Sequence, residues 1–196
     1  MRFLSLSVLL AVPVLLGAQD GAPAERPLAA FAAQRVAVTP VQFWRADSAG
    51  WSADVDGASL RARLDTAIAE EFRARGMSAR WAFAGEVMRS ARRNPTLRAD
   101  PAALGAGRWR GPLPQPGDAL PPLVADNLRT VSALGDTRYA LIPVELRGQG
   151  ADAVLRLVIA DTRLRTVVWS ADVLASGSPD AAAGLATRLA DLVVDP

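Results

Sequence analysis

The sequence predicts an α/β (α+β) fold: one domain over residues 35–196, with helices packed on a mixed five-stranded sheet in the order βαβ-α-α-βββ-α. Two patterns support this fold. Short β-branched runs alternate with stretches of helical period in the first half, and three strand-like runs follow one another near the end. The length of 196 residues, with 51% of them apolar, suits a single hydrophobic core.

The first 18 residues have the pattern of a signal peptide. Arg2 supplies the positive charge at the start, and Phe3 to Leu16 form an apolar segment that is too short to span a membrane comfortably. Ala18 provides a small residue at which cleavage can occur. Residues 19–34, rich in Ala, Pro and Gln, are expected to form a flexible leader. We therefore expect a protein of the bacterial cell envelope, located in the periplasm or secreted.

Two alternatives remain open at this end of the chain. Cleavage after Ala22 or Ala24 also fits, because Leu16 is a poor residue for an A-x-A-like site. An uncleaved anchor is the second alternative, although Pro13 would break an anchor helix. The chain has no cysteine, so it offers no site for lipoprotein attachment.

The first elements are predicted to be a strand, a helix and a second strand. The strand runs from Arg35 to Val41, and the helix from Leu60 to Arg75 is capped by Ser59. After Gly76 ends the helix, the second strand covers Ala79 to Phe83. Short links between these elements favour a parallel crossover.

The middle of the chain is predicted to hold two helices separated by one long loop. The first helix covers Ala84 to Arg93, and the second covers Leu123 to Leu134. Between them, residues 95–122 contain many Pro and Gly and show no periodicity, which predicts an irregular Pro/Gly-rich loop.

The last part is predicted to be an antiparallel meander followed by a helix. The three strands cover Tyr139–Leu146, Ala153–Asp161 and Thr166–Ala175, and Pro143 indicates either a sheet edge or a bulge. Ser178 and Pro179 are suited to begin the last helix, which extends to about Val193.

Three strings resemble a periplasmic α/β family that includes the globular part of the curli-secretion lipoprotein, the penicillin-binding-protein activator LpoB and the N-terminal domain of TolB. They are RVAVTPV at 35–41, LGDTRYALIPVEL at 134–146 and VLRLVIADTRLRTVVWSADV at 154–173. The resemblance implies the fold and the periplasmic compartment. Leu164-Arg165 stands where relatives place Thr-Gly, which predicts a left-handed backbone at Arg165. Pore formation and membrane anchoring are not implied, because no lipidation cysteine is present.

Composition excludes several kinds of chemistry. With no His and no Cys, the chain lacks the residues of Ser-His-Asp triads, thiolate zinc sites and histidine bases. The 22 basic and 20 acidic residues nearly cancel, so no overall field favours nucleic acid. Asp161, Asp172 and Asp180 lack the spacing of a metal-binding loop. We expect no catalytic residues, no cofactor and no metal, and hence a protein that is not an enzyme.

Two segments are candidates for binding. Phe43, Trp44 and Trp51 follow the first strand, where open α/β sheets place their binding crevices; the alternative is that these rings cap the core. In the long loop, Arg98 and the Arg108-Trp109-Arg110 segment have the composition of a protein-interface hot spot, the alternative being a solvated basic loop.

The expected function is that of a binding or assembly accessory module for another periplasmic or outer-membrane protein, using the sheet face and the long loop. The alternative is a binder of a small or polymeric envelope ligand through an aromatic crevice after the first strand; a hydrolase ranks third. The loop has few apolar side chains, so apolar burial does not explain why it is kept. We therefore expect its Trp109 to be exposed and available to a partner.

Overall fold

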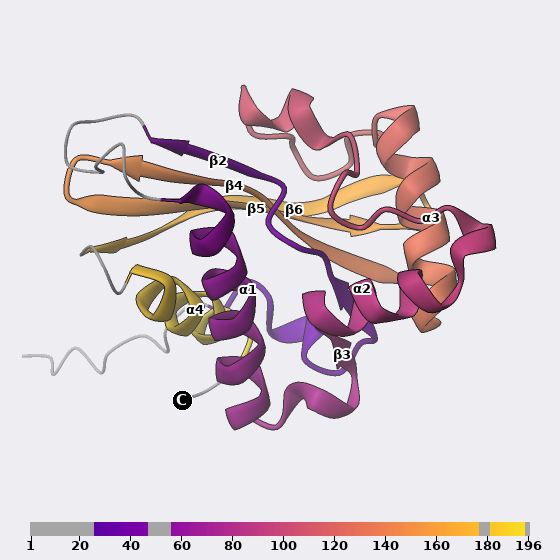
Figure 1. Cartoon of the computed structure of the whole chain (residues 1–196), viewed down its shortest axis with the longest axis horizontal. Helices are drawn as coiled ribbons and strands as arrows, with labels where there is room; N and C mark the ends of the chain where they lie inside the picture. Colours follow the sequence, from indigo (N-terminus) through magenta and orange to yellow (C-terminus); the bar gives the residue numbers. More distant parts are fainter. Residues whose placement is uncertain (1–25, 47–55, 177–180, 195–196) are drawn as a thin grey trace, which may run out of the picture.

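The computed structural model of the chain describes residues 26–46, 56–176 and 181–194. Its centre is one mixed sheet with helices on both faces (Figure 1). The strand order is β3-β1-β4-β5-β6, with β2 also paired to β4. The six strands are β1 (Val36–Val38), β2 (Phe43–Ala46), β3 (Trp81–Ala82), β4 (Tyr139–Gln149), β5 (Asp152–Asp161) and β6 (Thr166–Ser176). The predicted fold class is confirmed.

The first strand continues past an interruption as β2, which the sequence interpretation placed in a loop. Both β1 and β2 run parallel to β4: β1 pairs with its first residues from Tyr139, and β2 with its last from Glu145. Between them, Thr39 and Gln42 donate their backbone N–H groups to carbonyls of β4, at 3.0 and 2.9 Å. The predicted count of five strands is therefore wrong by one.

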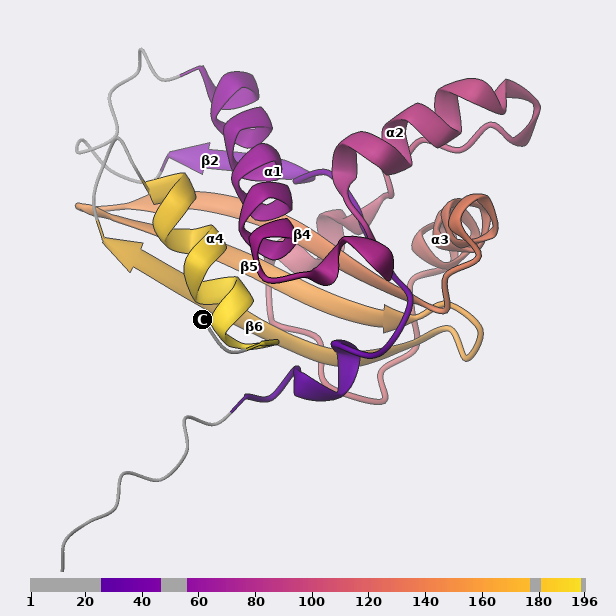
Figure 2. The ribbon, with the colours of Figure 1, turned by 90° about the horizontal axis from the view of Figure 1, so that it is seen from below.

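The helices divide between the two faces of the sheet (Figures 1 and 2). One face is covered by α1 (Gly57–Ala74) and α4 (Ala181–Asp191), whose apolar side chains pack on Leu155, Leu157 and Ile159 of β5. The other face is covered by α2 (Ala84–Arg93), α3 (Pro122–Gly135) and the loop between them. Both faces of β5 are thus buried, which explains its nearly continuous apolar sequence.

Helix α1 begins earlier than the sequence pattern indicates. Asp56 is the N-cap, and its carboxylate accepts from the backbone N–H groups of Ala58 and Ser59 at 3.0 and 3.2 Å. Ser59, the predicted cap, instead lies inside the first turn. The Ser178-Pro179 cap predicted for the last helix falls outside the described residues.

The meander β4-β5-β6 is antiparallel throughout, as predicted. Its register shifts between Pro143 and Glu145, so the proline sits at a bulge; β4 has neighbours on both sides and is not an edge strand. At the β5–β6 turn, Arg165 has φ 58°, the left-handed conformation that the sequence predicts.

The ends of the described chain lie together. The backbone N–H of Leu28 donates to the carbonyl of Leu192 at 3.0 Å, and Arg75 at the end of α1 donates to the carbonyl of Val194. Leu28 and Phe31, which the sequence interpretation assigned to the leader, are buried in the core beside α1 and α4. Ordered structure therefore starts before residue 35.

Candidate functional site

A cavity lies outside the carboxyl ends of β1 and β3. These two strands are parallel neighbours; β1 leads through β2 to α1, β3 leads directly to α2, and the two helices pack on opposite faces of the sheet. A parallel sheet opens a crevice at such a point, because the two connections leave in opposite directions. Pro40, two residues after β1, and Ala84, two residues after β3, both line the cavity.

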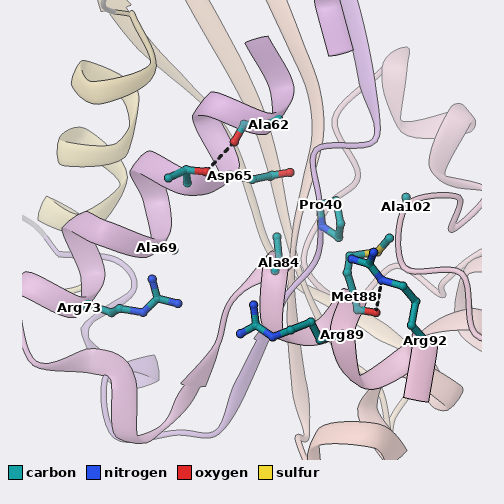
Figure 3. A pocket seen from close by; sticks show the side chains of 12 residues that line it. Pro40, Ala62, Asp65, Ala69, Arg73, Ala84, Met88, Arg89, Arg92 and Ala102 are labelled. Carbon is teal, nitrogen blue, oxygen red and sulfur yellow. Dashed lines mark hydrogen bonds between the residues drawn. The ribbon is translucent and has the colours of Figure 1, made fainter. Parts of the chain in front are cut away.

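The cavity has a volume of about 420 Å³, within the range of small-molecule sites. Small side chains form much of its wall, and longer polar ones reach in from α1 and α2 (Figure 3). The lining residues from α1 are Ala62, Asp65, Thr66, Ala69 and Arg73; those from α2 are Ala84, Gly85, Met88, Arg89 and Arg92; Pro40 and Ala102 complete it.

Three arginines give the cavity an excess of positive charge. Arg73 is paired with Glu86 at 2.9 Å and lies over the ring of Phe83. Neither Arg89 nor Arg92 forms an ion pair with any residue in the described ranges, and Arg92 Nε makes only a long bond, 3.4 Å, to a carbonyl of its own helix. Figure 3 shows Arg73 and Arg89 extending toward each other from α1 and α2.

Asp65 is the acidic group that lines the cavity. Its Oδ1 accepts from the backbone N–H of Val41 at 3.0 Å, which holds the carboxyl beside the carboxyl end of β1. Burial raises the pKa of Asp65 to about 7, outweighing the opposite effects of the Val41 N–H and the Arg61 charge. Near neutral pH this carboxyl is therefore protonated in a large fraction of the molecules.

The hydroxyl group in the cavity wall is engaged within its own helix. Thr66 donates its hydroxyl proton to the Ala62 carbonyl at 2.9 Å and not to Asp65, the carboxyl among the lining residues. In the part of the chain that the structure describes, no cluster of three or more acidic side chains could hold a metal ion.

The predicted aromatic residues do not line this cavity. Trp44 packs against the first turn of α1, where a Cβ on Gly57 would stand 2.1 Å from its ring, and Phe43 lies under the guanidinium of Arg110. Trp51 falls outside the described residues. The cavity after the first strand is lined by side chains of α1 and α2 and not by the aromatic residues named from the sequence.

The long loop is packed against the sheet, contrary to the interpretation that it has little to bury. It contains two short 3-10 helices, η3 (Pro95–Leu97) and η4 (Ala106–Arg110). Leu104 and Leu120 are fully or nearly fully buried, and Trp109 is 5% exposed. The expectation that Trp109 is exposed to a partner is therefore wrong: its ring fills the core between the loop and β4.

The arginines of the loop have different roles. Arg110 donates to the buried Glu145 of β4 at 2.6 Å, so it ties η4 to the sheet. The backbone carbonyls of Trp109 and Gly111 accept from Arg156 of β5, which also pairs with Asp172. Arg98 and Arg108 are exposed and lie in different elements, η3's C-cap and η4. The structure thus does not gather the predicted set into one exposed cluster.

Sequence reasoning missed the residues that line the cavity. A weak signal was present, because Arg89 and Arg92 are three residues apart and share one face of a correctly predicted helix. No pattern linked them to Asp65, which belongs to another helix and looks like an ordinary solvated residue.

No family model matches the sequence, and no curated protein matches it. Among solved structures, the LpoB C-terminal domain from Salmonella enterica matches with a TM-score of 0.41 and 11% identity, over 80% of this chain and 87% of that one. The Escherichia coli LpoB C-terminal domain matches with a TM-score of 0.42 and 12% identity, over 73% of this chain and 82% of that one. PelC from Paraburkholderia phytofirmans, solved as a dodecamer, matches with a TM-score of 0.38 and 16% identity, over 84% of this chain and 91% of that one.

LpoB C-terminal domains, which the sequence resemblance names, are thus among the structures to which the chain is similar. Because the TM-scores are only 0.41 and 0.42, the fold and the chemistry of the cavity are argued from the residues of this chain alone. Among the described residues, no helix combines the length and the apolar character that crossing a bilayer requires.

Proposed function

We propose that this chain is an exported, non-catalytic binding protein of the bacterial cell envelope, and that it holds its ligand or partner in the α1–α2 cavity. The signal-peptide pattern of residues 1–18 supports export. The observation that carries the binding role is a cavity of about 420 Å³ at the sheet's switch point, into which Arg89 and Arg92 bring charges with no protein counter-ion in the described ranges.

In-cell photo-cross-linking tests this role. A benzophenone amino acid replaces Ala102 at the cavity, and the matched control replaces Ala79, an exposed alanine at the amino end of β3. We expect an adduct, detected by mass, from position 102 and none from position 79. Adducts from both positions in equal yield, or from neither, would contradict binding at the cavity.

A second candidate is protein binding by the long loop through Arg98, after η3, and Arg108, in η4. The observation that favours it is that Arg98 and Arg108 are exposed and form no ion pair with the described residues. Their side chains are therefore available to an acidic partner surface. Arg98→Ala with Arg108→Ala should lower capture of an envelope partner in cells about tenfold or more, while the melting temperature stays the same. Unchanged capture would eliminate this surface.

A further inference from the structure

The cavity combines two cations with a protonatable acid, and this combination narrows the chemical class of its ligand. Arg89 and Arg92 bring two guanidinium charges from one face of α2, and Asp65 lines the same cavity from α1 (Figure 3). Gly85, in the first turn of α2, also lines the cavity, so a ligand there meets the amino end of a helix of 10 residues, which favours negative charge.

Resting on the proposed binding role, we propose that the α1–α2 cavity binds a phosphomonoester group as its dianion with the help of Arg89 and Arg92, and that Asp65 takes up one proton when the group binds. Two negative charges on one tetrahedral group match two guanidinium groups, whose planar donors suit phosphate oxygens. The cavity is much larger than one phosphate, so the organic part of a small phosphorylated compound also fits.

Asp65 explains why binding of the ligand should be coupled to the uptake of a proton. An ionised carboxylate beside a phosphate dianion would repel it, whereas a protonated carboxyl donates a hydrogen bond to a phosphate oxygen. The charged groups that line the cavity together with Asp65 are Arg73 on its own helix and Arg89 and Arg92 on α2; Arg61, also on α1, lowers the pKa of Asp65 through its charge. Because the pKa of Asp65 is already raised to about 7, protonation near neutral pH takes little further free energy.

Titration calorimetry with methyl phosphate tests the proposal, and methyl sulfate, of the same shape with one charge fewer, is the comparison ligand. We expect methyl phosphate to bind at least about tenfold more tightly than methyl sulfate. At about pH 8, titrations in buffers of different ionisation enthalpy should show uptake approaching one proton per bound ligand. Affinity should fall about tenfold or more between about pH 6.5 and about pH 8.5.

Variants separate the roles of the residues. Arg89→Ala with Arg92→Ala should weaken methyl phosphate binding at least about tenfold. The control, Arg63→Ala on α1 with Arg93→Ala on α2, removes the same number of charges from residues that do not line the cavity, and it should leave binding unchanged. Asp65→Asn keeps an acceptor for the Val41 N–H but should abolish proton uptake. The melting temperature of each variant shows that it is folded.

Two vesicle preparations distinguish a soluble source of the group from a lipid. Binding to vesicles with phosphatidic acid, a phosphomonoester, and not to vesicles with phosphatidylglycerol, a phosphodiester, would assign the group to a lipid; binding of soluble methyl phosphate alone assigns it to a soluble compound. Either result supports the proposal. Equal affinity for phosphate and sulfate, no binding, or proton uptake that survives Asp65→Asn would overturn it. A cross-link at position 102 without phosphate binding would overturn only this inference and leave the proposed function standing.

Discussion

The backbone conformation of Arg165 destabilises the turn in which this residue lies. Arg165 adopts φ 58°, which puts its Cβ close to a carbonyl oxygen and costs roughly 1–2 kcal/mol. Its guanidinium pairs with Asp126 at 3.0 Å, but both side chains are more than half exposed, so the pair contributes at most about 1 kcal/mol. Its carbonyl accepts from Leu120, which fixes the turn against the loop.

Replacing Arg165 with Gly and with Ala separates these two effects. Both substitutions remove the ion pair with Asp126, but only glycine adopts the left-handed conformation without strain. We therefore expect the glycine variant to be more stable than the alanine variant by about 1 kcal/mol, measured by urea unfolding. Equal stability of the two variants would show that this backbone angle is not strained.

At the scale of elements, the loop between α2 and α3 behaves as part of the core. Trp109 in η4 packs among buried side chains of α3 and β4, and Arg156 and Glu145 of the sheet bind the same short helix through hydrogen bonds. Such a segment is held by apolar burial and by charge pairs together, which fits its 3-10 turns in place of a disordered connection.

Truncation of Trp109 should therefore destabilise the whole domain. We expect Trp109→Ala to lower the free energy of unfolding by about 3–5 kcal/mol, the range for buried aromatic residues, as measured by chemical denaturation. The adjacent, exposed Arg108→Ala should change it by less than about 0.5 kcal/mol. If the two variants were equally stable, the ring of Trp109 would not be a core residue.

The elements also show where sequence patterns suffice. Helix α2 and the meander are predicted well, because their periodicity is strong and because Pro95 after α2 and Gly150 after β4 mark two of their ends. Strand β2 was missed because Phe43–Ala46 is only half-buried and becomes a strand through its pairing with the distant Glu145–Gly148. Trp109 was misjudged because its partners lie elsewhere in the sequence. The cavity could not be predicted for the same reason, because Asp65 and Arg89 line it together only when the chain is folded.

At the scale of the whole molecule, aspartates whose pKa values are shifted in opposite directions set how the free energy of unfolding depends on pH. Despite burial, backbone N–H groups and Arg138 lower the pKa of Asp161, and Arg156 and Arg147 lower the pKa of Asp172. Burial raises the pKa of Asp65 to about 7. The first two contribute stability above the unfolded pKa and lose it as the pH falls through their folded values. Asp65 contributes stability at low pH, which is lost as the pH rises toward about 7.

The free energy of unfolding should consequently be highest near about pH 4, close to the unfolded pKa of these carboxyls, and should decline from there as the pH rises toward about 7. Asp65→Asn should remove the decline on the neutral side and leave the acid side unchanged, because Asp161 and Asp172 are intact. Urea unfolding across this pH range measures both effects. A decline toward neutral pH that persists in Asp65→Asn would assign it to another group.

The hydrogen bond between Leu28 and Leu192 has a topological consequence, because it places the two ends of the described chain side by side. A short peptide could connect residue 194 to residue 26, and the chain could be opened instead at Gly150, in the turn between β4 and β5. Such a circular permutant would keep every strand pairing of the sheet. The order in which the elements follow one another along the chain is thus separable from the architecture they build.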